Sequence, residues 1–502
     1  AQANVLLKLS GCLRHVGTQA MGCLPKDFLW GAAVSAHQVE GKNVHSDAWY
    51  AEHVPGGPFE EPSGKAIGHY EQFKKDIELL GELGLNAFRF SIEWARVQPE
   101  ADAWNEEAVG HYKEVLEACR AESLTTIVTL HHFTSPLWFV ARGGFRKPEN
   151  SQAFANYCGR IVQVLGPLID YVCTVNEPNV PKMSMAIHGA RTGEVESGGA
   201  FGVVGGILAH SSSFGGGASG GAFWGMPQRV RRLVAQTLLP RWAQCHCSSE
   251  EPSVSRVSGR LTTMVQHARV IATMCQRCQC RPEELGGPFP FIAVGAEDEF
   301  SAGFSEAHKQ AVRAIRAADE EGRIKVGLTM SMGGFWAVPG SEGVCKQLQA
   351  ETEDWVLDMA RDSASDFIGV HVQFETPVGP SGPELSINRF SAEGLEHAIR
   401  YAAQRSRLPV LVAEHGLATE DDEERVKFLQ QAGRAVRRCV HDGISVFGYI
   451  YARLFDAYEW TYGYESKAGL IAVDRKSPTL SRQIKGSAYT LRELASLGGV
   501  KN

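Results

Sequence analysis

The stretch DYVCTVNEP, residues 170–178, decides the fold of this chain. It is rich in β-branched and aromatic residues over the length of a buried strand, and it ends in the polar pair Asn176 and Glu177. The same arrangement, an apolar run that ends in polar side chains, recurs along the chain. We therefore interpret residues 170–178 as one strand of a repeating strand and helix unit.

Eight such strands are expected, and amphipathic segments separate most of them. In the first of these segments Phe73, Ile77 and Leu80 recur at helical spacing, while charged residues fill the other face. Eight parallel strands joined by helices close naturally into a barrel. The sequence therefore predicts an α/β fold, a single (β/α)8 TIM barrel. The expected strands are Phe28–Ala36, Ala87–Trp94, Thr125–Phe133, Asp170–Pro178, Ile324–Met332, Asp366–Phe374, Leu408–Gly416 and Val446–Leu454.

The connection between the fourth and fifth strands is far longer than a βα unit needs, which predicts a long insertion there. Residues 191–225 contain 12 of the chain's 53 glycines, so this part has low complexity. We expect an N-terminal extension (1–20), the first barrel half (21–190), a Gly-rich and Cys-containing insertion (191–303) and the second barrel half (304–502). As a surface loop, the insertion is expected to be dispensable for folding.

The insertion also carries thiols and imidazoles in a number that a tetrahedral zinc site needs. Their spacing fits no common zinc module, so incidental thiols are the favoured interpretation and no metal is expected. The residues concerned are Cys245, His246, Cys247, His267, Cys275, Cys278 and Cys280.

Composition limits the partners and the compartment. The chain has 502 residues, of which 44% are hydrophobic and 21% charged, as in ordinary globular proteins. A net charge of −7 gives no basic surface for nucleic acid or for an anionic membrane. The 12 cysteines are too few for a disulfide scaffold, and the apolar run Val5–Leu13 lacks the features of a secretory signal. We therefore expect a cytoplasmic protein, with its oligomeric state left open.

Two carboxylates stand at strand ends on opposite sides of the expected barrel. Glu177 ends the fourth strand and Glu414 ends the seventh. In a TIM barrel these ends meet at one mouth, where catalytic groups lie. Glycoside hydrolysis with retention of configuration requires two carboxyl groups about 5–5.5 Å apart, one as nucleophile and one as acid and then base. The pair is therefore a candidate for that chemistry.

The chain resembles glycoside hydrolase family one, the β-glucosidase family, in its bacterial-type branch. The resemblance covers most of the chain and depends on many motifs in the family's order. They are FLWGAA (28–33), HQVEG (37–41), FRFSIEW (88–94), TLHHF (129–133), NEP (176–178), DFIG (366–369), YEW (458–460) and GL (469–470).

The resemblance implies a role for each matched residue. Glu177 is the expected acid/base, Glu414 the nucleophile, and Asn176 a partner of the sugar's 2-hydroxyl. The resemblance also implies that no metal or organic cofactor takes part and that the partner is a small or oligosaccharide β-glycoside. Sugar binding is expected from Gln38, His132, Glu459 and Trp460, and support of the nucleophile from Arg89 and Gln373.

Several positions near the nucleophile depart from the family pattern. Gln373 stands where a tyrosine is expected, Ala452 replaces the Trp of a Trp-Ser-Leu segment, and His415 replaces an Asn. These losses predict a weakened member of the family. Two alternatives to a β-glucosidase therefore remain: a sugar-binding pseudoenzyme of the same fold, and a 6-phospho-β-glycosidase. The sugar and aglycone preference is left open.

Overall fold

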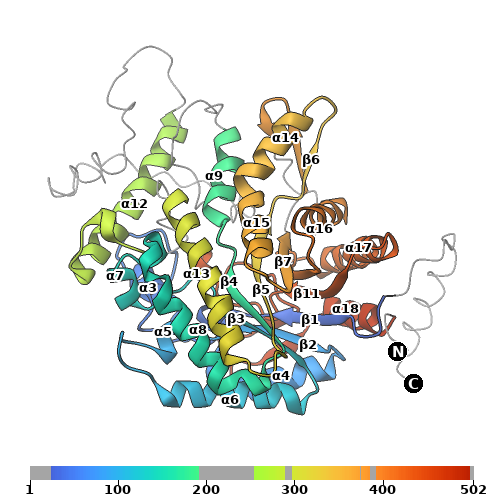
Figure 1. Ribbon diagram of the computed structural model, residues 1–502, viewed down its shortest axis with the longest axis horizontal. Helices are drawn as coiled ribbons and strands as arrows, with labels where there is room; N and C mark the ends of the chain where they lie inside the picture. The colour runs from blue at the N-terminus through green and yellow to red at the C-terminus, as the bar shows by residue number, and fades with distance from the viewer. Residues whose placement is uncertain (1–23, 192–253, 289–296, 373–374, 385–391, 498–502) are drawn as a thin grey trace.

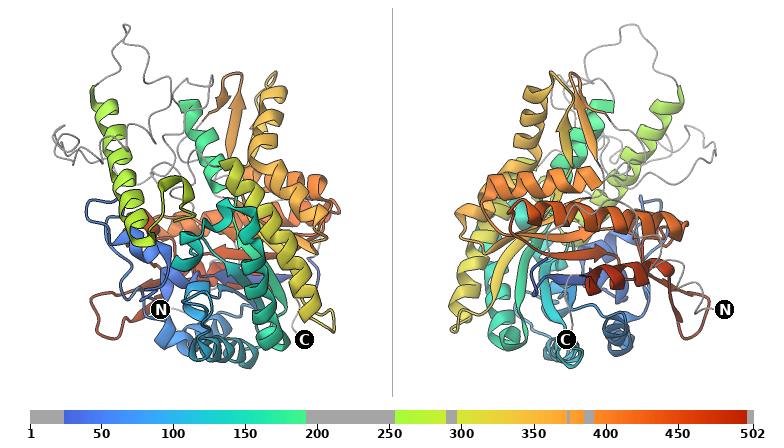
Figure 2. Two further views of the ribbon diagram at one scale, coloured as in Figure 1. Left: turned by 60° about the vertical axis from the view of Figure 1, so that its left-hand side comes forward. Right: turned by 90° about the vertical axis from the view of Figure 1, so that its right-hand side faces the viewer.

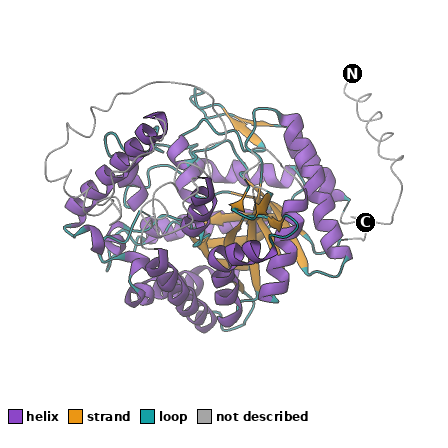
Figure 3. Ribbon diagram, turned by 90° about the horizontal axis from the view of Figure 1, so that it is seen from above, coloured by secondary structure: helices purple, strands orange, loops and turns teal. Residues whose placement is uncertain are grey.

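The protein folds as a closed barrel of eight parallel strands surrounded by helices (Figures 1 and 3). The computed structural model describes residues 24–191, 254–288, 297–372, 375–384 and 392–497. The strand order around the barrel is β1-β11-β10-β7-β5-β4-β3-β2, which confirms the predicted TIM barrel. The barrel strands are β1 (Leu29–Ala33), β2 (Ala87–Ser91), β3 (Thr125–His131), β4 (Tyr171–Asn176), β5 (Lys325–Met332), β7 (Phe367–Val372), β10 (Val410–His415) and β11 (Val446–Ala452).

The helices pack one apolar face on the barrel. In α4 (His69–Glu82), Phe73, Ile77 and Leu80 are buried, as their spacing predicted. Other helices that follow barrel strands are α6 (Glu106–Ala121), α8 (Ser151–Leu165), α13 (Glu297–Ala318), α15 (Trp355–Asp362), α16 (Ala392–Ser406), α17 (Asp422–His441) and α18 (Gly486–Ser496). Further elements are α2 (Ala36–Val39), α3 (Asp47–Glu52), α5 (Trp94–Val97), α7 (Leu137–Ala141), α9 (Val180–Arg191), α12 (Val254–Cys278), α14 (Glu342–Gln349), β6 (Phe335–Ala337), β8 (Thr376–Gly379), β9 (Gly382–Pro383), β12 (Ile471–Val473) and β13 (Arg482–Ile484).

Side chains fill the barrel at the end where the strands begin. Tyr171, Phe367 and Phe447 contact one another there, with ring centroids 5.4–5.8 Å apart. Above these rings lie buried aliphatic and small side chains that point into the barrel, among them Ile127 and Leu411. This packed layer is the barrel floor, and it leaves the functional groups at the opposite end, where the strands finish.

The end of the insertion packs against the barrel. Helix α12 lies beside α3 and α7 (Figure 2), and Val270, Met274 and Leu285 form a buried cluster with Ala51 and Val140. The expectation that the insertion is a surface loop is therefore wrong for this part. Helix α13 also begins at Glu297, inside the range predicted for the insertion. Residues 192–253 lie outside the described part.

Replacing Met274 by alanine is expected to destabilise the protein by about 2–5 kcal/mol. The side chain is fully buried between α12 and the barrel, so its loss leaves a cavity. Denaturant unfolding measures the effect, and the matched control is Thr273→Ala, an exposed position on the same helix. Equal stability of the two variants would show that α12 does not contribute to the core.

Two further features are the state of the cysteines and the apolar length of the helices. The eight cysteines within the described ranges are free thiols, and five of them are buried. None of the helices that the structure describes is long and apolar enough to span a bilayer.

Candidate active site

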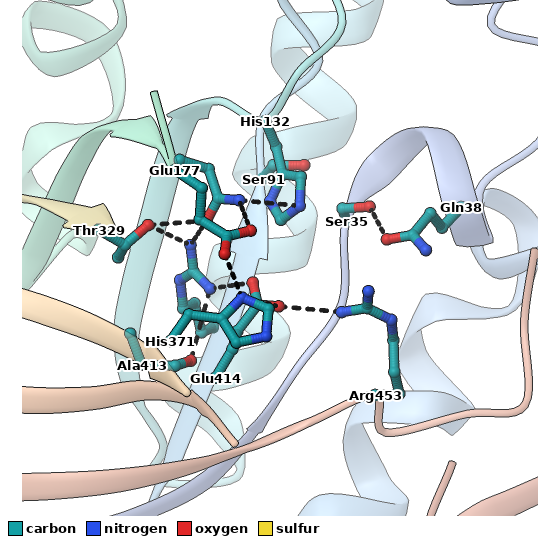
Figure 4. A network of polar contacts seen from close by, with 12 residues as sticks. Ser35, Gln38, Ser91, His132, Glu177, Thr329, His371, Ala413, Glu414 and Arg453 are labelled. Carbon is teal, nitrogen blue, oxygen red and sulfur yellow. Dashed lines mark hydrogen bonds and ion pairs between the residues drawn. The ribbon is translucent and has the colours of Figure 1, made fainter. Parts of the chain in front are cut away.

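The two predicted carboxylates meet at the mouth of the barrel. Glu177 follows β4 and Glu414 lies in β10, and both are almost fully buried. An oxygen of each lies within 4.8 Å of the other (Figure 4). Two carboxyl groups at such a separation leave room for a sugar C1 but not for an additional water molecule, which is the arrangement of a retaining glycosidase.

The backbone at Glu177 is held in an unusual conformation. Its φ is +46°, in the left-handed region that non-glycine residues rarely adopt. The Glu177 amide donates to the carbonyl of Thr329 in β5 at 2.8 Å, which fixes the turn at the end of β4. Such strain costs about 1–3 kcal/mol and is typical of functional sites, where it directs a side chain toward the reacting atoms.

Arg89 joins the nucleophile side to the acid/base side. The Arg89 guanidinium, from β2, donates to Oε1 of Glu414 through Nη1 and to Oδ1 of Asn176 through Nη2. Thr329 donates to the same Asn176 oxygen at 2.7 Å, and the Asn176 amide donates to Oε2 of Glu177 at 3.1 Å. Arg89 and Asn176 therefore lie beside the two carboxylates.

Glu414 is surrounded by positive charge. Burial would raise the pKa of its carboxyl, but Arg89, His371 and Arg453 outweigh burial, and the pKa of Glu414 is lowered. The carboxylate is therefore ionised over the whole ordinary pH range, as a nucleophile requires.

Arg453 is a site residue that the sequence analysis missed. It follows β11 with a φ of +75°, and its Nη1 lies 2.9 Å from Oε2 of Glu414. Its Nε and Nη2 pair with Glu459. Arg453 stands where the expected Trp-Ser-Leu segment has its serine. An arginine at this serine position was the signal that could have revealed it. A predicted sugar-binding carboxylate, Glu459, is thus paired with an arginine.

His371 is a second site residue that the sequence analysis missed. It comes from β7, and its Nδ1 lies 2.5 Å from Oε1 of Glu177 and 3.7 Å from Oε2 of Glu414. It stands two residues after Gly369 and two residues before Gln373, at the position where the family pattern has Asn or Gln. Gln373 itself lies outside the described residues.

The other predicted sugar-binding residues lie around this centre. Nε2 of His132 is 3.3 Å from the Asn176 amide, and burial lowers the pKa of His132 well below its usual value, so the ring is neutral. The Gln38 side chain accepts from Ser35 at 2.6 Å and donates to the Tyr458 carbonyl at 2.7 Å. Trp460 stacks on His37 with ring centroids 5.2 Å apart. These contacts of Gln38 and Trp460 lie outside the carboxylate network.

Ala452 and His415, two of the departures from the family pattern, have different surroundings. Ala452 is buried, and its β-carbon and carbonyl lie next to Gly416. His415 stacks on Phe428 of α17, and its Nδ1 lies 2.9 Å from the Tyr449 hydroxyl. Burial lowers the pKa of His415 to about 3, so the ring is neutral. The His415 imidazole therefore packs toward the outer helices.

Glu177, His371 and Glu414 are the group of described side chains whose ligand atoms come close enough to hold a metal ion. Each oxygen of Glu414 already pairs with a guanidinium, of Arg89 or of Arg453. A divalent cation there would lie next to two fixed positive charges, so these residues do not fit a metal well.

Comparisons with known proteins agree with the geometry. The family model described as Glycosyl hydrolase family 1 matches residues 20–198 and 363–500. The crystal structure of beta-glycosidase BGL167 is 34% identical, with a TM-score of 0.74, and the match covers 95% of this chain and 98% of that one. Beta-glucosidase A of Acetivibrio thermocellus and the aryl-phospho-beta-D-glucosidase BglC of Bacillus subtilis are each 22% identical, over 95% of this chain and 98% of the relative.

Proposed function

This chain belongs to glycosyl hydrolase family 1, and we propose that it hydrolyses O-linked β-D-glycosides, β-glucosides foremost, with retention of configuration. The observation that carries the proposal is the close approach of the Glu177 and Glu414 carboxylates at the mouth of a TIM barrel. This spacing suits a double displacement through a covalent glycosyl-enzyme.

Glu414 attacks C1 of the sugar, and Glu177 protonates the departing glycosidic oxygen. Glu177 then takes a proton from the water that releases the sugar. The lowered pKa of Glu414 keeps the attacking carboxylate charged. Hydrogen bonds from Arg89 to Glu414 and from Asn176 to Glu177 fix the positions of the two carboxylates.

The sugar is bound by side chains that give directional hydrogen bonds and one aromatic face. An amide, an imidazole and a carboxylate distinguish hydroxyl orientations because a misplaced hydroxyl leaves them unpaired. These side chains are Gln38, His132, Glu459 and Trp460, with Gln373 as a further support of the nucleophile. The eight cysteines in the described ranges are free thiols, and five of them are buried, which is consistent with a cytoplasmic location.

Replacing Glu177 by glutamine is expected to lower kcat/KM on phenyl β-glucoside by about 10²–10⁴-fold, the usual contribution of a general acid. On 2,4-dinitrophenyl β-glucoside the loss is expected to be far smaller, because that phenolate leaves without protonation. Steady-state kinetics on both substrates measures the difference. An equal loss on both would mean that Glu177 is not the proton donor.

A weakened enzyme is the second candidate, and the ion pairs of Arg453 with Glu414 and Glu459 favour it. These ion pairs engage the carboxylate of Glu459, which would otherwise bind the sugar, and the carboxylate of Glu414, which would otherwise attack C1. Turnover of p-nitrophenyl β-glucoside with and without a 6-phosphate separates the three functions: rapid hydrolysis of the neutral sugar, preference for the phosphorylated sugar, or binding without turnover.

A further inference from the structure

His371 lies between the two carboxylates of the site (Figure 4). Its place follows from the barrel register, which sets it beside Glu414 of β10 and Ser331 of β5. The ring is 5% exposed, so water does not screen it from its neighbours. Nδ1 of His371 lies 2.5 Å from Oε1 of Glu177, within the distance of an ion pair.

Among the described residues, one carboxylate of the site has no guanidinium paired with it. Arg89 pairs with Glu414, and Arg453 pairs with both Glu414 and Glu459. The described contacts of the Glu177 carboxylate are the Asn176 amide and the His371 ring. Three buried carboxylates and two arginines carry one excess negative charge, which one bound proton neutralises. The His371 ring, 2.5 Å from Glu177, can hold that proton.

The groups around the imidazole favour its protonated form. Burial lowers the pKa of His371, but Glu177 and then Glu414 outweigh burial and the opposing Arg453, and the pKa is raised. Neighbouring His415 is neutral because burial lowers its pKa to about 3. Strand β5 contributes Ser331 next to the ring, and its charged residue, Lys325, lies at the other end of that strand.

We infer that His371 is a positioning residue that stores the proton which Glu177 delivers to the leaving group. The inference rests on the proposed function of Glu177. In the resting site the proton sits on Nδ1 of His371. As the bond from C1 to the aglycone oxygen breaks and the bond from C1 to Glu414 forms, the proton passes through Glu177 to the aglycone oxygen. Neutral imidazole remains.

The second half-reaction restores the resting site. Water attacks C1, the bond from C1 to Glu414 breaks, and a proton of the water passes to Glu177 and back to Nδ1 of His371. Charge and protons balance over the two steps, and no other reactant is needed. Because its pKa is raised, the His371 imidazole keeps this proton at a higher pH than an ordinary histidine would.

The test compares the pH profiles of wild type and His371→Asn. Asparagine is polar and close in size to histidine, but it cannot carry the proton. The alkaline limb of kcat/KM on phenyl β-glucoside is expected to move down by about one pH unit or more. On 2,4-dinitrophenyl β-glucoside, which needs no acid, the two enzymes should differ by only a few fold. An unmoved alkaline limb, or an equal loss on both substrates, would overturn the inference.

The matched control is His308→Gln. His308 is also buried, in α13, between the hydroxyls of Thr174 and Ser365. Its replacement is expected to affect stability but to leave the alkaline limb in place. A shift in both variants would indicate general loosening of the barrel and would contradict a specific role of His371.

A measurement without turnover separates this inference from the proposed function. In protein labelled with ¹⁵N-histidine, the His371 signal, assigned by its absence in His371→Asn, should titrate above the ordinary histidine range. In Glu177→Gln the midpoint should fall by about one pH unit or more, because the paired charge is gone. An unchanged midpoint would refute the proton-sharing pair even in an active enzyme. Inactivity on both aryl glucosides would refute only the proposed function.

Discussion

Glu414→Gly is expected to lower kcat on aryl β-glucosides by about 10⁴-fold or more, because the attacking carboxylate is lost while the binding site remains. Sodium azide fits the space left by the side chain and should restore turnover of 2,4-dinitrophenyl β-glucoside. Azide then attacks C1 from the side that Glu414 occupied, so the product should be the α-glycosyl azide. NMR of the purified product checks its configuration.

A matched control is Glu353→Gln, a buried carboxyl in the segment before α15. Burial raises the pKa of Glu353 to about 8, so the group is already mostly neutral at pH 7 and glutamine replaces it closely. Activity should stay within a few fold of wild type. A β-configured azide product from Glu414→Gly would contradict the retaining mechanism, and full activity of that variant would exclude Glu414 as the nucleophile.

Arg453→Met is expected to destabilise the fold by about 3–5 kcal/mol at pH 7. The guanidinium is 17% exposed and pairs with two carboxylates that are more deeply buried. Methionine keeps much of the side-chain volume but leaves Glu414 and Glu459 without this positive charge. Urea unfolding at several pH values measures the effect.

The loss should depend on pH with a definite sign. The pKa of folded Glu414 is lowered, so its ionisation stabilises the fold above the unfolded value near 4.3, and this stability is lost as the pH falls toward the folded pKa. Without Arg453 the pKa is lowered less, so the difference from wild type should shrink below pH 4.3. Arg438→Met removes an arginine that is 43% exposed and should cost less than about 1 kcal/mol. Equal costs for the two variants would mean that the Arg453 pairs contribute no net stability.

The barrel could be predicted from sequence because its signals are local. Each strand is an apolar run that ends in polar side chains, and each helix has apolar residues at helical spacing, so the element type depends on neighbours in the chain. The part of the insertion that packs on the barrel was not predictable. Met274 and Leu285 are apolar residues in a segment without a strand pattern, and their partners Ala51 and Val140 are far away in sequence.

The candidate site was predictable only where residue type and motif agreed. Glu177 and Glu414 stand at strand ends within recognisable motifs, and the structure brings them together. His371 and Arg453 were missed because each replaces an expected uncharged residue. A motif comparison shows that such a residue differs from the family pattern but not what the new side chain contacts. Their importance depends on which carboxylates they meet across the barrel, and that is set by the register of β7 and by the turn after β11.

The closed barrel floor has a consequence for the order of events in catalysis. The rings of Tyr171, Phe367 and Phe447 fill the barrel at the end where the strands begin. The departing alcohol and the incoming water must therefore both pass through the mouth of the barrel. A small alcohol in the solvent has the same access to the glycosyl-enzyme as water has. The enzyme should therefore transfer sugar to added methanol, and the ratio of methyl glycoside to free sugar should rise in proportion to the alcohol concentration.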